Sequence, residues 1–240
     1  MKEISTKNSF ISSLTFHPKE KIIAIGTDQE KIELLDFQGN SINVIPTQPG
    51  WITSLSFHPQ KNIIASGDEN GIINLWTKEG KLLKSLNNHQ QEILDLTFSP
   101  DGQYLVSASK DTTLNLWTVE GEKIKTLSGH TQDIHQVVFN PNSSIIASGD
   151  AAGVIKLWDK EGTPLITLNA SETKINSLRF TEDGLNLISG DNQGVVIVWP
   201  LQIQTLLNQS CRWLDDYWLT HPQQLKEEYS RCTSANQNIK

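Results

Sequence analysis

The sequence predicts an all-β fold in which one four-stranded unit recurs along residues 1–200 of the 240. Phenylalanine returns at a fixed step of 41 residues (57−16, 98−57, 139−98, 180−139), at Phe16, Phe57, Phe98, Phe139 and Phe180. Tryptophan keeps the same step at Trp76, Trp117, Trp158 and Trp199. A fixed period of about 40 to 45 residues with four short strand patterns per unit is typical of β-propeller blades. The sequence therefore predicts a propeller of five four-stranded blades.

The third unit illustrates the strands that we expect in every blade. Its inner strand runs from Ile93 to Phe98, with a β-bulge between Leu94 and Asp95. The tetrapeptide Ser-Pro-Asp-Gly at 99–102 has proline and glycine where a type I turn favours them, so a hairpin follows. The remaining strands are expected over residues 104–107, 113–117 and 123–127.

The other units align with the third by the same step. Their outer strands are expected over residues 41–45, 81–86 and 164–168. The fifth unit has no predicted outer strand, because Trp199 is followed by Pro200, which lacks the N–H that a strand ladder needs. Met1 and Ile4 lie 41 residues before Ile42 and Ile45, so residues 1–5 are in register to form an outer strand without a blade of their own.

Several repeated columns resemble the WD-repeat family over about residues 1–200. A proline follows the phenylalanine by two residues at Pro18, Pro59, Pro100 and Pro141, and Glu182 replaces the last one. The Trp-Asp pair occurs at 158–159 and the Gly-His pair at 129–130, while Leu35 replaces the first tryptophan of its column.

The resemblance leaves the number of blades in the complete ring open. Five blades form either a small closed ring, with residues 1–5 pairing along residues 195–199, or part of a larger propeller. Closure of a ring removes exposed strand edges, which otherwise promote aggregation.

Residues 201–240 do not repeat, and we expect them to form a short α-helical tail. Apolar residues recur there at helical spacing, at Ile203, Leu206, Leu207, Leu214, Tyr217 and Trp218. A second helix is expected from a capping box at 220–223 through Tyr229. The segment from Cys211 to Tyr217, with Pro222 and Cys232 beyond it, is similar to the tail that closes many large bacterial WD-repeat proteins. We expect the apolar stripe to dock on the propeller.

Composition excludes several functional classes. The net charge of −7 and the pI of about 5.4 argue against a protein that neutralises nucleic-acid phosphates. No apolar run is long enough for a membrane span, and residues 1–8 lack the apolar segment of a signal peptide, so we expect a cytoplasmic protein. Cys211 and Cys232 fit no metal-site spacing, and no cofactor is predicted.

One unit contains serine, histidine and aspartate together, which invites comparison with a catalytic triad. The resemblance instead implies that His89, Ser107, Asp111 and Trp117 form a structural hydrogen-bond network, and a fully satisfied buried network rigidifies a fold. Only the third unit has the complete set by alignment, because Ala152 replaces the aspartate in the fourth. Blade three is therefore expected to be the most rigid. No nucleotide-binding or nucleophile-elbow motif is present, so we expect a protein without enzymatic activity.

The resemblance implies a partner-binding face where the inner strands begin and the turns between the second and third strands lie. The candidate residues are Phe10, Trp51, Glu92, Asp133, His135 and Lys174 from the inner strands, and Asp28, Glu69 and Lys110 from the turns. Trp51 is the strongest candidate, because exposed aromatic residues are typical interface anchors; the alternative is local packing on Pro49. The acidic members favour a basic or polar peptide.

These patterns favour a protein- or peptide-binding scaffold, acting alone or as the sensing part of a larger assembly, and monomeric or weakly oligomeric. Two alternatives remain: an enzyme that uses the central channel, near Asp133 and His135, and a truncated structural fragment.

Overall fold

The computed structural model describes residues 10–201, and every regular element in this range is a β-strand. Short strands of five or six residues follow one another along the chain, separated by turns. They are β1 (Ile11–Phe16), β2 (Ile22–Thr27), β3 (Lys31–Asp36), β4 (Ser41–Pro46), β5 (Ile52–Phe57), β6 (Ile63–Asp68), β7 (Ile72–Thr77), β8 (Leu82–Asn87), β9 (Ile93–Phe98), β10 (Tyr104–Ser109), β11 (Leu114–Thr118), β12 (Lys123–Leu127), β13 (Ile134–Phe139), β14 (Ile145–Asp150), β15 (Val154–Asp159), β16 (Pro164–Asn169), β17 (Ile175–Phe180), β18 (Asn186–Asp191) and β19 (Val196–Pro200).

Consecutive strands pair antiparallel to form one sheet per repeat. The first four blades are four-stranded sheets made of β1 to β4, β5 to β8, β9 to β12 and β13 to β16. Blade five contains three strands within the described residues, β17 to β19. The predicted all-β fold of repeated propeller blades is confirmed. Strands β9 and β12 have the predicted bounds, whereas β10 ends two residues later than predicted and β11 is shifted by one residue.

Each inner strand carries an irregularity near its start. In blade three, Ala108 pairs with Asp95 whereas Ser109 pairs with Ile93, so Leu94 is the extra residue of a β-bulge. The same shift occurs at the start of the inner strands of the other four blades. The predicted bulge is thus confirmed as a property of the repeat.

The hydrophobic core lies between neighbouring blades. We call the side of a blade that meets the next blade in the chain its trailing face, and the opposite side its leading face. In the joint between blades one and two, the trailing face consists of Ile22, Ala24, Ile32, Leu34 and Ile45, and the leading face of Ile52, Leu55, Phe57, Ile64 and Trp76. All ten residues are buried.

A glycine at the centre of three of these joints allows the sheets to approach closely. A Cβ atom built on Gly26, Gly67 or Gly149 would lie 2.5 to 2.7 Å from the Cγ2 atom of an isoleucine in the next blade. Such contacts are too short for real side chains, so these three joints require glycine at their observed spacing. Ala108 takes the equivalent position in blade three.

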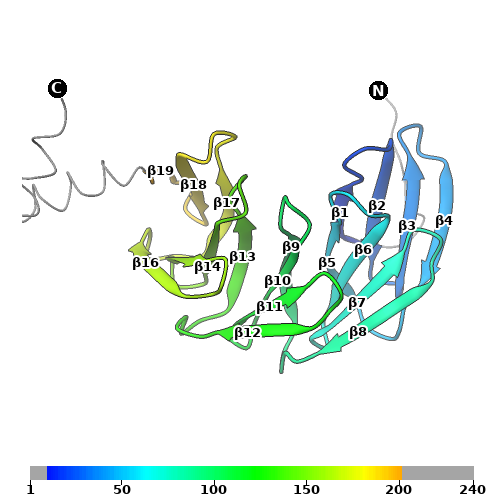
Figure 1. Ribbon diagram of the computed structural model, residues 1–240, viewed down its shortest axis with the longest axis horizontal. Helices are drawn as coiled ribbons and strands as arrows, with labels where there is room; N and C mark the ends of the chain where they lie inside the picture. Colours follow the sequence, from blue (N-terminus) through cyan, green and yellow to red (C-terminus); the bar gives the residue numbers. More distant parts are fainter. Residues whose placement is uncertain (1–9, 202–240) are drawn as a thin grey trace, which may run out of the picture.

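The described blades form an arc that is open on one side. The inner strands pack in succession, β1 on β5, β5 on β9, β9 on β13 and β13 on β17. Figure 1 shows the arc running from β1 to β4 on the right, through β8 and β12 below, to β16 to β19 on the left, with an opening between the first and last blades that is narrower than the arc. The predicted pairing of residues 1–5 with residues 195–199 and the predicted helical tail lie outside the described residues.

Candidate interaction face

The two sets of residues that the repeat aligned lie side by side in every blade. The backbone N–H of each turn residue donates a hydrogen bond to the carbonyl of the residue that precedes the inner strand. These donor and acceptor pairs are Asp28 and Phe10, Glu69 and Trp51, Lys110 and Glu92, Ala151 and Asp133, and Asn192 and Lys174, at 2.9 to 3.3 Å. The turns and the strand starts therefore form one edge of the arc, which we call the interaction face.

Blades one and two place exposed aromatic side chains on this face. Phe10 is 80% exposed and Trp51 is 57% exposed. Their backbone N–H groups donate to the carboxylates of Asp28, at 3.0 Å, and Glu69, at 3.1 Å. The acidic turn residues thus hold the backbone of the aromatic residues in place, while the aromatic rings remain open to solvent.

Blades three to five place a charged group on the same face. Lys110 forms an ion pair with Glu92 that also raises the pKa of the lysine. Burial lowers the pKa of His135, as does the positive charge of Lys174, while Asp133 opposes this effect. The imidazole is therefore favoured in its neutral form at neutral pH. Carboxylates still outnumber ammonium groups among the candidate residues of the interaction face. Because Lys110 neutralises Glu92, the face is less negative than its acidic residues alone predicted.

Hydroxyl side chains next to the aromatic residues link neighbouring blades. The Ser12 and Thr53 hydroxyls donate to the carbonyls of Gly26 and Gly67 in their own blades, each at 3.1 Å. The same hydroxyls also contact the carbonyls of Ile52 and Ile93 in the next blades. These two residues stabilise the joints beneath the interaction face, so Phe10 and Trp51 project from a fixed base.

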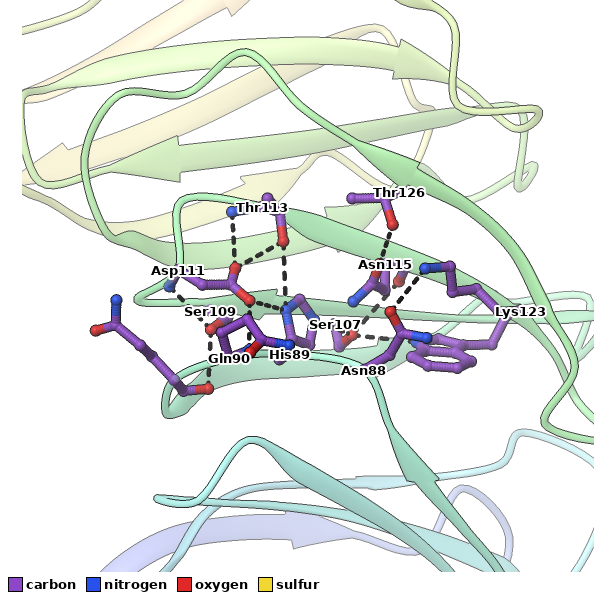
Figure 2. Close-up of polar contacts among 12 residues, drawn as sticks. Asn88, His89, Gln90, Ser107, Ser109, Asp111, Thr113, Asn115, Lys123 and Thr126 are labelled. Carbon is purple, nitrogen blue, oxygen red and sulfur yellow. Dashed lines mark hydrogen bonds and ion pairs between the residues drawn. The ribbon is translucent and has the colours of Figure 1, made fainter.

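The four residues aligned as a structural network are joined in blade three. Figure 2 shows His89 between Asp111 and Ser107: its Nδ1 lies 2.8 Å from the carboxylate and its Nε2 lies 2.9 Å from the hydroxyl. The indole N–H of Trp117 donates to the same hydroxyl at 3.1 Å. His89 is 3% exposed and Ser107 is fully buried, so no substrate reaches this serine.

The geometry assigns a direction to the donors in this network. Trp117 can only donate to Ser107 and the Asp111 carboxylate can only accept from His89. Nδ1 of His89 therefore carries a proton, while the Ser107 hydroxyl lies within hydrogen-bond distance of both Nε2 of His89 and the carbonyl of Asn115. Burial raises the pKa of Asp111, but the hydrogen bonds from His89, Thr113 and Gln90 outweigh it and hold this pKa below its usual range.

The prediction that only blade three has a complete network is wrong. In blade four the carboxylate of Asp150 lies 2.7 Å from Nδ1 of His130, and Nε2 of His130 lies 2.8 Å from the hydroxyl of Ser148. Trp158 donates to that hydroxyl at 2.9 Å. The carboxylate comes from a position two residues before the aligned Ala152, so the network no longer distinguishes blade three as the most rigid.

Asp95 is a buried carboxylate that the sequence patterns did not single out. It accepts hydrogen bonds from the backbone N–H groups of Leu96 and Val137, both at 2.9 Å, and contacts the Ser54 hydroxyl at 3.4 Å. It therefore connects the inner strands of blades two, three and four. Burial raises the pKa of Asp95 to about 6, although the two amides and the charge of Arg179 oppose this shift. The sequence contains one indication of this role, because the residues equivalent to Asp95 in the other four units are all uncharged: Ser13, Ser54, Gln136 and Ser177.

Within residues 10–201, no three His, Cys, Asp or Glu side chains gather where they could hold a metal ion. In the same range, no helix is long and apolar enough to cross a membrane.

Comparisons with known proteins agree with the repeat geometry. A family model described as IFT140 first beta-propeller matches residues 3–140, which is more than half of the 240 residues. A second model, described as WD domain, G-beta repeat, matches residues 162–200. The comparison with curated proteins found no match.

Proposed function

The chain belongs to the WD-repeat β-propeller family, and from this premise we propose that its interaction face binds a polypeptide partner without catalysing a reaction. Domains of this family generally mediate protein interactions. The observation that carries the proposal is Trp51, an exposed aromatic residue whose backbone is fixed at the start of a strand.

The chemistry of the face defines the partner. Phe10 and Trp51 are equivalent residues of adjacent blades, so together they offer an apolar surface to one hydrophobic anchor. The adjoining blades offer Asp133, the Glu92 and Lys110 pair, and a neutral imidazole at His135. A peptide with an apolar or aromatic side chain followed by basic or polar residues matches this order. A module that binds peptides in this way can act as a scaffold or as the sensing part of a larger assembly.

Within residues 10–201, the two groups that most resemble catalytic residues are both engaged in structural hydrogen bonds, which supports the non-enzymatic part of the proposal. The Ser107 hydroxyl is buried and already bonded to Trp117 and His89. Asp95 has a raised pKa, as many catalytic acids do, yet both of its oxygens are bonded to neighbouring strands. Neither residue is presented to a substrate.

A displayed library of random linear peptides tests the proposal with the full chain. We expect selected peptides to carry an apolar residue near basic residues, and we expect Trp51→Ala to weaken their binding about 30-fold, the effect of losing a hot-spot side chain. Isothermal titration calorimetry measures the affinities. Leu83→Ala is the matched control, since Leu83 is 46% exposed but lies on the outer strand β8. Peptides that bind the wild type and Trp51→Ala equally would contradict the proposed site.

A further inference from the structure

The four joints between blades use the same residue columns, so the two ends of the arc can be compared with them directly. By the 41-residue step, the leading face of blade one consists of Ile11, Leu14, Phe16, Ile23 and Leu35. The trailing face of blade five consists of Asn186, Ile188, Gly190, Val196 and Val198. Each end therefore carries one half of a joint that the chain completes four times internally.

The inner-strand residues of this leading face are exposed where their equivalents are buried, whereas Leu35 of β3 is 3% exposed, like the equivalent Trp76 at 4%. Ile11, Leu14 and Phe16 are 46%, 49% and 58% exposed. The matching residues of blade two, Ile52, Leu55 and Phe57, are 1%, 6% and 7% exposed. Among its neighbours, Phe16 packs edge to face on Phe37, which is itself 50% exposed.

The trailing face of blade five shows the same contrast. Val196 and Val198 are 68% and 56% exposed, whereas the equivalent Ile32 and Leu34 of blade one are 0% and 1% exposed. A Cβ atom on Gly190 would meet nothing within 4 Å, although the equivalent glycines each lie against an isoleucine of the next blade. The glycine needed for a close joint is thus present without its partner.

We propose that these two faces bind a partner polypeptide that supplies further WD-type blades. Next to blade five, the partner presents an isoleucine that enters over Gly190, as Ile52 does over Gly26. Next to blade one, it presents a residue with little or no side chain to receive Ile11. This inference concerns the ends of the arc and does not depend on the proposed function of the interaction face.

The shape of the arc argues against a second copy as the partner. The opening between blades one and five is narrower than the arc of five blades (Figure 1). A second copy docked on one end would run into the other end before all of its blades were placed. A partner that contributes fewer blades fits both ends at once.

Inserted copies of the chain's own repeat can stand in for the partner. Residues 119–159 span 41 residues, which is one full period. They supply the outer strand of one blade and the first three strands of the next, so copies placed after Pro200 continue the repeat. We compare the wild type with full chains that carry one, two or three such copies. Hydrogen exchange followed by mass spectrometry reports on β1, at the opposite end of the chain from the insert.

We expect β1 to exchange faster than β5 in the wild type and to slow at least about tenfold at one insert length. Gly190→Val in that extended chain should restore fast exchange in β1, because the new side chain occupies the space that the inserted isoleucine needs. In the wild-type background the same substitution should leave stability unchanged, since nothing lies within 4 Å.

Three results would overturn the proposal. In the first, the inserted units are protected from hydrogen exchange but β1 exchanges fast at every insert length. This must hold both for inserts copied from residues 119–159 and for inserts copied from residues 78–118. In the second, β1 and β5 exchange equally slowly in the unextended chain, which would mean that this face is already covered. In the third, sedimentation velocity detects a dimer of the wild type that Ile11→Asp dissociates, which would identify a second copy as the occupant.

Discussion

The hydrogen-bond network of blade three makes a testable contribution to stability. Asp111→Ala would remove the acceptor of the His89 Nδ1 proton and of the backbone N–H of Gln90, which donates to the same carboxylate at 2.9 Å. A donor left unpaired in a buried site costs about 1 to 3 kcal/mol. We therefore expect Asp111→Ala to lower the free energy of unfolding by about that amount in urea denaturation.

A surface carboxylate provides the control for this substitution. Glu120 forms an ion pair with Lys61 at 3.8 Å, and both side chains are more than half exposed. Exposed pairs of this kind contribute about 0 to 1 kcal/mol, so Glu120→Ala should be close to neutral. If the two substitutions had the same effect, the network would have no special structural role.

Asp95 gives the fold a pH dependence of the opposite sign to that of most carboxylates. Its folded pKa of about 6 lies above the ordinary value of 3.8, so between these values the folded state binds more protons than the unfolded state. Its contribution to stability is therefore present below about pH 4 and is lost as the pH rises through about 6, by up to about 3 kcal/mol.

Asp95→Asn should remove this dependence, because the amide does not titrate and its oxygen can still accept from Val137. We expect the unfolding free energy of the variant, relative to wild type, to rise from pH 4 to pH 6 and then level off. Denaturant titrations at a series of pH values measure the difference. Parallel curves for the two proteins would show that Asp95 is not the titrating group.

Single residues were predicted where the repeat keeps them in one column. The columns of His89, Ser107 and Trp117 led directly to the network. Asp150 was missed because a carboxylate two residues earlier in the turn reaches the same imidazole atom, and a fixed 41-residue step does not detect such a substitution. The raised pKa of Asp95 depends on burial between three strands, which periodicity does not describe.

At the scale of the elements, the glycine columns control how closely two blades approach. A Cβ on Gly67 would lie 2.5 Å from Cγ2 and 2.8 Å from Cβ of Ile93, so Gly67→Ala requires the blades to separate. Overpacking of this kind costs about 1 to 3 kcal/mol. Thermal unfolding should show a clear loss for Gly67→Ala, whereas Gly190→Ala should be neutral or slightly stabilising. Equal effects at the two positions would refute the assigned joint geometry.

The strands themselves were predictable because turns and apolar alternation both repeat. The predicted third strands ended at the tryptophan column, one residue before the observed ends. The difference arises because the following residue still pairs across the turn, as Thr118 does when its N–H donates to the carbonyl of Glu122 at 2.8 Å. Strand ends of this kind depend on turn geometry more than on residue type.

For the whole molecule, the sequence predicted five blades but left closure of the ring open. All joints use the same columns, so a repeat pattern contains no information about how strongly successive blades turn. That angle depends on the volumes of the packed side chains in each joint. The exposed Ile11, the exposed Val196 and the open space at Gly190 are properties of the assembled arc.

The N-terminal residues provide a test at the same scale. By register, the sequence predicts that residues 1–5 form the outer strand of a blade next to blade one, since Ile4 corresponds to Ile45, which is fully buried in β4. In a closed ring of five blades that blade would be blade five, and residues 1–5 would pair along β19. In an arc completed by a partner, they would instead join the partner's last blade.

Deletion of residues 1–6 distinguishes these two arrangements. Because the described ends of the arc do not pack together, we expect the deletion to leave hydrogen exchange in β19 and the sedimentation of the isolated chain unchanged. In the chain extended by inserted repeats, the same deletion should speed exchange in the outermost inserted blade, which loses its fourth strand. Faster exchange in β19 of the isolated chain, together with self-association through the freed strand edge, would instead show that residues 1–5 close a five-bladed ring.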